Sequence, residues 1–146
     1  FITDAQTISL NLGNGITTSV EITPTADLHN AISQADFISA HVPKQADGSA
    51  VFGAEEFEIM KDGVRIVNAA RGGVIDEDAL LVALDSGKIA AVALDVFENE
   101  PNPRKDLLNH PKIACTPHIG AATKEAQDRI GTELANSIIE KFGVFA

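Results

Sequence analysis

Near its middle the chain reads Val64-Arg65-Ile66-Val67-Asn68-Ala69-Ala70-Arg71-Gly72-Gly73, a short and nearly continuous apolar run that passes directly into a glycine pair. Runs of this length and composition are typical of strands that are covered on both faces, as in parallel sheets. Similar apolar runs occur at residues 36–42, 90–96 and 112–116. The sequence therefore predicts a mostly parallel sheet built from these four runs.

Segments with helical periodicity separate the predicted strands. The clearest one begins at the acidic run Asp76-Glu77-Asp78, continues with an apolar stripe of leucines and is stopped by Gly87. Shorter helices are predicted at residues 25–33 and 54–60. Alternating strands and helices imply right-handed crossovers, which gives an α/β fold with a doubly wound, mostly parallel sheet. In such sheets ligands bind at the carboxyl ends of the strands.

The two ends of the chain show different patterns. Apolar residues alternate on either side of Gly13-Asn14-Gly15, which predicts a hairpin with a tight turn within residues 1–24. Between Thr123 and Phe142 apolar residues recur at helical spacing, and Gly143 can end the helix. This segment is predicted to be one long amphipathic helix, with apolar positions at Ala126, Ile130, Leu134, Ile138 and Phe142.

The composition excludes several classes of protein. Within 146 residues, 11 basic and 21 acidic side chains leave a formal charge of -10, which repels nucleic acid and anionic lipid. The apolar stretches fall short of the ~18 residues that span a bilayer, so no membrane is expected as a partner. The single cysteine, Cys115, excludes an internal disulfide and fits a reducing cytoplasm. No metal site is predicted, and an anionic substrate would need a local cation.

Such a cation is Arg71, which follows the strand predicted at residues 64–68. Its planar guanidinium offers two parallel donors that match a carboxylate. The adjacent Gly72 and Gly73 let the backbone approach a ligand closely. The alternative is that Arg71 is an ordinary surface side chain in a turn, and the local sequence favours neither interpretation.

Two further strands also end in polar residues. In Ala93-Leu94-Asp95-Val96-Phe97-Glu98-Asn99-Glu100-Pro101 the acids begin as soon as the apolar run stops. They either serve solubility alone, or Asp95 binds an amide or hydroxyl of a ligand and Glu100 polarises an imidazole. The candidate imidazole is His118, in Cys115-Thr116-Pro117-His118-Ile119-Gly120. Most lone histidines are structural or merely exposed, but one at a strand end can exchange a proton with a substrate hydroxyl.

These three sites predict a carboxylate anchor, a proton-transfer group and a partner that orients it, each at the end of a different strand. Oxidation of a 2-hydroxy acid requires this set. Because proton removal from the hydroxyl accompanies departure of a hydride from the same carbon, the hydride acceptor must be a cofactor.

Three blocks, Asn68–Gly73, Ala93–Pro101 and Thr116–Ala121, resemble in order and spacing the D-isomer-specific 2-hydroxyacid dehydrogenases. The resemblance runs from about Ala31 to Gly143 and implies an NAD-dependent oxidoreductase with a Rossmann-like fold. It also implies roles for single residues. Arg71 would bind the substrate carboxylate, His118 would be the acid/base and Glu100 its partner, and the cofactor site would include Val42, Ala69, Ala70, Asp95, Gly120 and Ala121.

Within the family, residues 120–127 are most similar to the D-3-phosphoglycerate dehydrogenases, which oxidise 3-phosphoglycerate to 3-phosphohydroxypyruvate in serine biosynthesis. Lactate and glycerate dehydrogenases share the three blocks, and so do nucleotide-sensing corepressors of the same fold. Another D-2-hydroxyacid dehydrogenase, a corepressor-like scaffold and a fragment without function of its own therefore remain as alternatives. Relatives are commonly homodimers, so a homodimer is expected.

The sequence departs from the family at one motif. A G-x-G-x-x-G loop, followed about twenty residues later by an acid for the ribose, is missing, and Gly13-Asn14-Gly15 does not replace it. We expect the loop to lie before Phe1, which leaves the sheet incomplete at its N-terminal side. Residues 1–122 would form a partial dinucleotide-binding domain, and residues 123–146 a long helix returning towards a substrate domain absent from this chain. Such a piece would bind NAD weakly or not at all, and its sequence does not decide between NAD and NADP.

Overall fold

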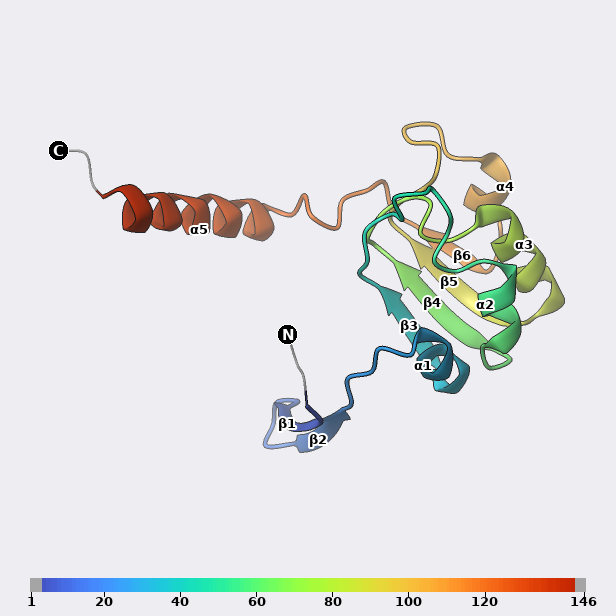
Figure 1. Ribbon diagram of the computed structural model, residues 1–146, viewed down its shortest axis with the longest axis horizontal. Coiled ribbons are helices and arrows are strands. Elements are labelled where there is room, and N and C mark those ends of the chain that lie inside the picture. The colour runs from blue at the N-terminus through green and yellow to red at the C-terminus, as the bar shows by residue number, and fades with distance from the viewer. Residues whose placement is uncertain (1–3, 144–146) are drawn as a thin grey trace.

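The computed structural model describes residues 4–143 and contains a four-stranded parallel sheet (Figure 1). All four predicted strands are present, and their bounds differ from the prediction by at most two residues. Each strand pairs with its neighbour in parallel register. The predicted Rossmann-like sheet is therefore confirmed, with the strands in the order β3 (Phe37–Ala40), β4 (Val64–Asn68), β5 (Ile89–Leu94) and β6 (Ile113–Cys115).

Four helices connect or flank these strands: α1 (Leu28–Gln34), α2 (Ala54–Ile59), α3 (Glu77–Ser86) and α4 (Lys105–Leu108). The first three confirm the predicted helices. Asp27 and Asp76 begin α1 and α3 by accepting hydrogen bonds from backbone N–H groups of the first turn. α3 ends at Gly87, whose φ of 83° is left-handed. α4 has no counterpart in the sequence prediction, because four residues are too few to show a helical period.

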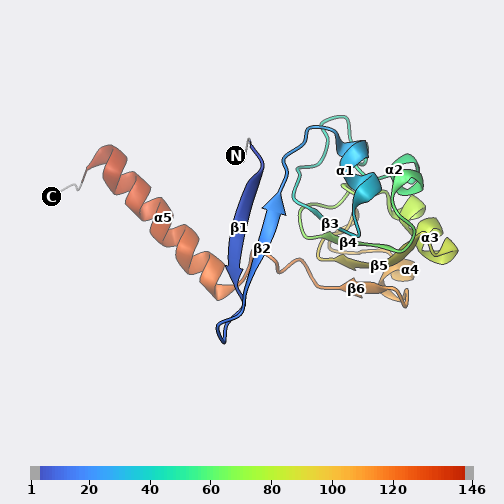
Figure 2. The same cartoon turned by 90° about the horizontal axis from the view of Figure 1, so that it is seen from below.

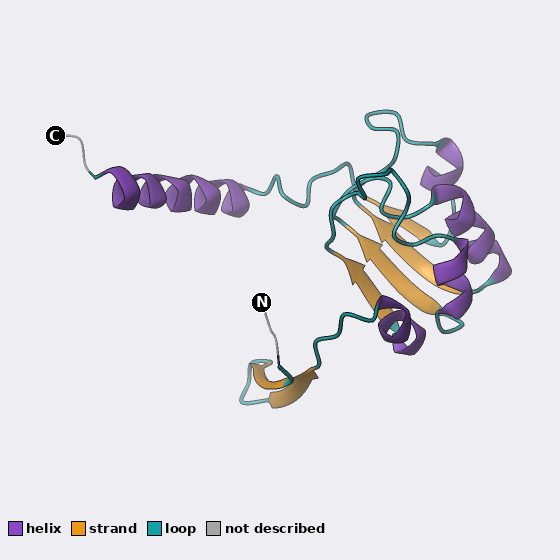
Figure 3. Ribbon diagram, in the orientation of Figure 1, coloured by secondary structure: helices purple, strands orange, loops and turns teal. Residues whose placement is uncertain are grey.

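The helices lie against the sheet (Figure 3), and one hydrophobic core of buried side chains holds them there. It joins Ile32 of α1, Phe57 of α2, Leu84 of α3 and Leu107 of α4, which are at most 3% exposed. The core-facing strand residues are every second one in β4, where Val64, Ile66 and Asn68 are buried. Since all four helices contribute to this single cluster, they cover the same face of the sheet.

The opposite face of the sheet is open within the described residues. Val67 of β4 is 44% exposed and Phe37 of β3 is 72% exposed, with the guanidinium of Arg65 lying 5.5 Å from the centre of the Phe37 ring. The prediction that the strands are covered on both faces is therefore wrong for this chain. The apolar run at residues 64–68 carries the composition of a two-sided strand, but residues 4–143 supply a covering layer for one side only.

The two ends of the chain extend away from the sheet (Figures 1 and 2). β1 (Gln6–Asn11) and β2 (Thr17–Ile22) form the predicted antiparallel hairpin, and Gly13, Asn14 and Gly15 in its turn all have positive φ. α5 (Lys124–Phe142) is the predicted long helix, capped by Thr123, and none of its residues is buried. Within residues 4–143 no helix combines the length and the apolar character needed to cross a bilayer.

Candidate active site

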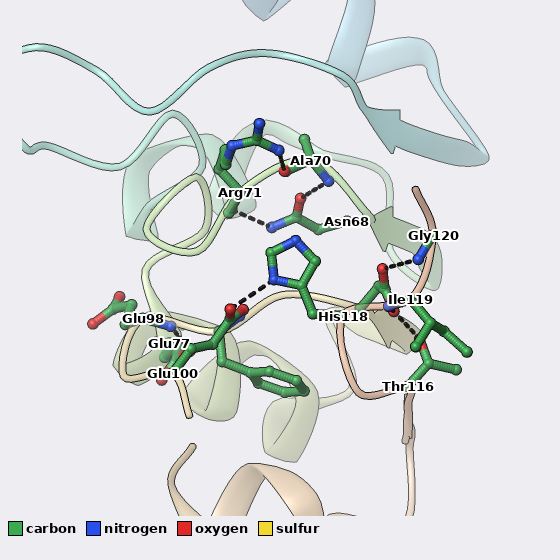
Figure 4. A network of polar contacts seen from close by, with 12 residues as sticks. Asn68, Ala70, Arg71, Glu77, Glu98, Glu100, Thr116, His118, Ile119 and Gly120 are labelled. Carbon is green, nitrogen blue, oxygen red and sulfur yellow. Dashed lines mark hydrogen bonds and ion pairs between the residues drawn. The ribbon is translucent and has the colours of Figure 1, made fainter. Parts of the chain in front are cut away.

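Three loops meet at the carboxyl edge of the sheet. They follow β4, β5 and β6, which are neighbouring parallel strands, so their first residues lie at the same edge. Figure 4 shows the polar contacts that these loops make with one another. Arg71, Glu100 and His118, predicted from three separate stretches of sequence, each lie on one of these loops.

The loop after β4 is shaped by Asn68, which is 2% exposed at the end of the strand. Its side-chain amide donates to the carbonyl of Arg71 at 3.1 Å, and its side-chain oxygen accepts from the N–H of Ala70 at 3.0 Å. The Arg71 guanidinium bonds only the carbonyl of Ala70, and no carboxylate within residues 4–143 pairs with it. A cavity of about 300 Å³ lies beside it, lined by His41, Val42, Pro43, Ala70 and Arg71.

Gly72 lets the loops after β4 and β5 touch directly. A Cβ placed on Gly72 would lie 1.9 Å from the carbonyl oxygen of Phe97, a distance at which no side chain fits. Gly72 therefore has a packing reason: the backbone that follows Arg71 rests on the backbone that precedes Glu100.

The loops after β5 and β6 are joined through Asp95, which is 7% exposed. One carboxylate oxygen accepts from the Thr116 hydroxyl at 2.5 Å and from the Ile119 N–H at 2.9 Å, and the other accepts from the Gly120 N–H at 2.7 Å. Burial opposes ionisation, but these donors outweigh it and lower the pKa of Asp95. Asp95 thereby fixes the backbone on both sides of His118.

His118 has a left-handed backbone, with φ of 56°, and this conformation turns its ring towards Glu100. Nδ1 of His118 lies 2.6 Å from Oε2 of Glu100, whose other oxygen accepts from the Phe97 N–H at 2.9 Å. The hydrogen bond from His118 is the main cause that lowers the pKa of Glu100. Since an ionised carboxylate can only accept, Nδ1 is the donor in this contact, and in the neutral imidazole Nε2 is then the nitrogen that can accept a proton.

Two more cavities lie along the same edge. One of about 290 Å³ is lined by Phe97, Glu100, Pro101, Pro103, Pro117 and His118. The other, of about 370 Å³, has small apolar walls from β4, β5 and β6 together with Ala69, Asp95 and Gly120. A Cβ placed on Gly120 would lie 2.8 Å from the Asp95 carboxylate. Glycine therefore allows the backbone to approach this carboxylate more closely than a residue with a side chain could.

The structure groups the predicted residues around three hollows. Val42, Ala70 and Arg71 line the first, Ala69, Asp95 and Gly120 the second, and Glu100 and His118 the third. Ala121 lines none of them, and its carbonyl accepts from the Gln127 side chain at 3.3 Å.

Sequence reasoning missed three residues that build the site: Asn68, Gly72 as a contact with Phe97, and Thr116 as a donor to Asp95. Asn68 leaves a signal in the sequence, as a polar residue that closes an apolar run, and the glycine pair indicates a close backbone approach without showing that its partner is Phe97.

The chain resembles known proteins over most of its length. Residues 10–120 match the sequence model of the D-isomer specific 2-hydroxyacid dehydrogenase family, NAD binding domain. The chain is 54% identical over 110 residues to D-3-phosphoglycerate dehydrogenase 2, chloroplastic, of Arabidopsis thaliana, covering 74% of this chain and 18% of that protein. It is 47% identical over 121 residues to hydroxypyruvate reductase of Thermotoga maritima, covering 81% of this chain and 40% of that protein.

Among solved structures, D-mandelate dehydrogenase of Rhodotorula graminis in its holo form superposes with a TM-score of 0.72 at 34% identity, covering 80% of this chain and 34% of that one. A glyoxylate reductase from Paecilomyes thermophila gives a TM-score of 0.68 at 42% identity, covering 81% and 37%. The chain thus spans less than half the length of each of these relatives.

Proposed function

Because this chain belongs to the D-isomer-specific 2-hydroxyacid dehydrogenases, as part of their NAD-binding domain, we propose that it supplies the catalytic edge of an enzyme that transfers a hydride between NAD and a D-2-hydroxy acid. The observation that carries the proposal is the 2.6 Å contact between His118 and Glu100. It leaves one imidazole nitrogen free beside a cavity at the carboxyl ends of the strands.

The reaction needs one proton acceptor and one hydride acceptor. His118 takes the proton of the substrate hydroxyl on Nε2, while the electron pair of the O–H bond forms the new carbonyl bond to carbon 2. When bound, NAD⁺ would supply the acceptor for the hydride that leaves carbon 2 with its bonding electrons. Glu100 stabilises the imidazolium through Nδ1–H, as its hydrogen bond already orients the ring.

Arg71 would hold the substrate carboxylate. Its guanidinium has no carboxylate partner within residues 4–143, and it lies in a chain whose overall charge is -10. A bidentate pair with the substrate would fix the distance from the carboxylate to carbon 2 and present the hydroxyl to His118. The 300 Å³ cavity beside Arg71 supports this role.

The residues of this chain fit the nicotinamide end of the cofactor. The cavity at Asp95 has small apolar walls that suit a flat ring, and Gly120 leaves no Cβ in the way. Three of the four lone-pair positions of the Asp95 carboxylate are used, so one remains for a carboxamide N–H. Within residues 4–143 no glycine loop suited to the pyrophosphate is present, because Gly13-Asn14-Gly15 forms the hairpin turn between β1 and β2.

We therefore propose that this chain is part of a longer enzyme. Residues 1–122 would be the second part of its dinucleotide-binding domain, and residues 123–146 would lead towards a separate substrate domain. We propose NAD as the cofactor, a homodimer as the assembly, and the reducing cytoplasm as the compartment, which suits the unpaired Cys115.

For the substrate we propose 3-phosphoglycerate, oxidised to 3-phosphohydroxypyruvate in serine biosynthesis. The support is that several relatives at 42% to 56% identity are D-3-phosphoglycerate dehydrogenases. Hydroxypyruvate, mandelate and glyoxylate enzymes resemble the chain comparably well, so the assay must include their substrates.

The test is NADH formation by the full-length enzyme with 3-phosphoglycerate, D-glycerate, glycolate, D-lactate and D-mandelate. We expect the highest kcat/KM for 3-phosphoglycerate. Turnover of another acid at a higher kcat/KM would reject the substrate while keeping the enzyme class. Binding of NADH without turnover of any 2-hydroxy acid would reject the enzyme and favour a nucleotide-sensing scaffold.

A further inference from the structure

A second acidic residue, Glu77, binds the loop that carries Glu100. Glu77 takes no part in the proposed reaction. Glu77 is the first residue of α3 and is only 6% exposed. Its Oε1 accepts a hydrogen bond from the N–H of Glu98 at 2.8 Å, and Glu98 lies two residues before Glu100 (Figure 4). A buried carboxylate therefore connects a rigid helix to the loop of the proton-transfer pair.

Burial of the Glu77 carboxyl group costs free energy, so its position needs a physical explanation. Loss of solvent raises the pKa of Glu77, and the N–H of Glu98 counters this only in part. An acid at the start of a helix interacts favourably with the helix dipole, but it can do so while exposed, as Asp78 does with a side chain that is 85% exposed. The first turn of α3 thus does not require a buried acid, whereas the loop does require an acceptor for the Glu98 N–H.

The contact belongs to a short chain of bonds that leads to His118. Phe97 rests on Gly72, Glu98 is bound by Glu77, and the N–H of Phe97 binds Glu100. Glu100 then reaches His118 with its other oxygen. The side chain of Glu100 is 34% exposed, so its own burial does not fix it, and its placement depends on the backbone of residues 97–100.

We infer that Glu77 is a positioning residue: its buried carboxylate holds the loop of residues 97–100 so that Glu100 reaches His118. The charged groups that act on Glu77 are Glu98, Arg104 and Asp106, and those that act on Glu100 are His118 and Asp95. What the loop requires at position 77 is an acceptor. Glutamine supplies one without a charge, whereas alanine supplies none.

The first test is independent of catalysis and uses this 146-residue chain. The carboxyl carbon of Glu100 is titrated by NMR in the wild type and in Glu77→Ala, Glu77→Gln and Asp78→Ala. In the wild type the hydrogen bond from His118 lowers the pKa of Glu100. We expect Glu77→Ala to raise this pKa towards the ordinary glutamate value, and Glu77→Gln and the matched control Asp78→Ala to leave it unchanged. An unchanged pKa in Glu77→Ala, or Glu77→Gln behaving like Glu77→Ala, overturns the inference.

Should Glu77→Ala fail to fold, the wild type and Glu77→Gln still decide. Amide hydrogen exchange at Glu98 should be slow in both proteins, because both offer an acceptor to this N–H. Exchange at the rate of a free loop amide in the wild type would overturn the inference.

The kinetic test rests on the proposed function and uses the full-length enzyme. Glu77→Ala should lower kcat by about 10- to 100-fold, because a displacement of a catalytic group by about 1 Å can cost about 10²-fold in rate. The same change in a Glu100→Ala background should cost little more, because both act through one contact. Independent, additive losses would overturn the inference. Absence of activity in the unaltered enzyme would instead reject the proposed function, and the Glu100 titration would still test Glu77.

Discussion

The sheet body (residues 28–120) and the end segments (the β1–β2 hairpin and α5) have equally regular sequence patterns and very different surroundings. In the sheet body every second residue of β4 is buried, and one core joins four helices. In the end segments no residue of α5 is buried, and the hairpin is exposed along its length except at Ile22. Periodicity thus predicts local structure in both regions, but it predicts a packing partner only where the chain supplies one.

The two regions also differ in their relation to the candidate site. All of the hydrogen bonds that shape the candidate site, from Asn68 to Gly120, lie within the sheet body. We therefore expect substitutions in the sheet body to change rate and stability, and similar substitutions in the end segments to change neither by much.

The largest effect is expected at His118. His118→Asn in the full-length enzyme removes the proton acceptor and should lower kcat/KM by about 10²- to 10⁴-fold. Asparagine adopts the left-handed conformation that His118 has, so the circular dichroism spectrum should not change. Glu133→Gln in α5, where the side chain is 73% exposed, is the control and should retain the wild-type rate. A rate loss below tenfold at His118 would refute its role.

The next effect compares two leucines in helices. Leu80 of α3 is 0% exposed, and Leu80→Ala should lower the free energy of unfolding by about 2–5 kcal/mol through the cavity that it leaves. Leu134 of α5 is 60% exposed, and Leu134→Ala should change it by less than about 0.5 kcal/mol. Urea denaturation of this chain measures both. Equal losses would mean that α5 packs against the sheet body in solution.

Much of the sheet body could be predicted from sequence because strand composition, helix caps and glycine stops agree with one another there. The run at residues 64–68 gives β4 with its bounds, and Asp76 with Gly87 gives α3. The three candidate site blocks follow adjacent parallel strands, so predicting the strands also placed Arg71, Glu100 and His118 at one edge.

The remaining features depend on contacts between distant segments, which no local pattern contains. The bond from Glu98 to Glu77 joins residues 21 positions apart, and the bond from Gly120 to Asp95 joins residues 25 positions apart. Each is a side chain bound to backbone, and any residue with an N–H can be the donor. The open face of the sheet could not be predicted either, because composition shows that a strand can be covered and not whether a covering layer is present.

Acidification should distinguish the two regions by a smaller effect. The pKa values of Asp95 and Glu100 are lowered in the fold by their hydrogen bonds. Such groups stabilise the fold above their unfolded pKa, and this contribution is lost as pH falls through the folded pKa. The free energy of unfolding should therefore decrease as the pH is lowered below about 4. This decrease should be less steep in Asp95→Asn. Glu133→Gln in α5 should keep the wild-type slope, and a slope that is unchanged in Asp95→Asn would contradict the prediction.

The smallest effect, and the sharpest test of whether the regions are independent, is a pair of glycine substitutions. Gly131 lies inside α5 with no atom near its missing Cβ, so Gly131→Ala should stabilise that helix by about 1 kcal/mol. Gly87 ends α3 with φ of 83°, and Gly87→Ala should destabilise the sheet body by about 1–2 kcal/mol. Circular dichroism should show more helix in Gly131→Ala with an unchanged unfolding midpoint, and a lower midpoint in Gly87→Ala. Because an isolated helix melts gradually and a packed one melts with its core, a raised midpoint in Gly131→Ala would mean that α5 and the sheet body unfold as one unit.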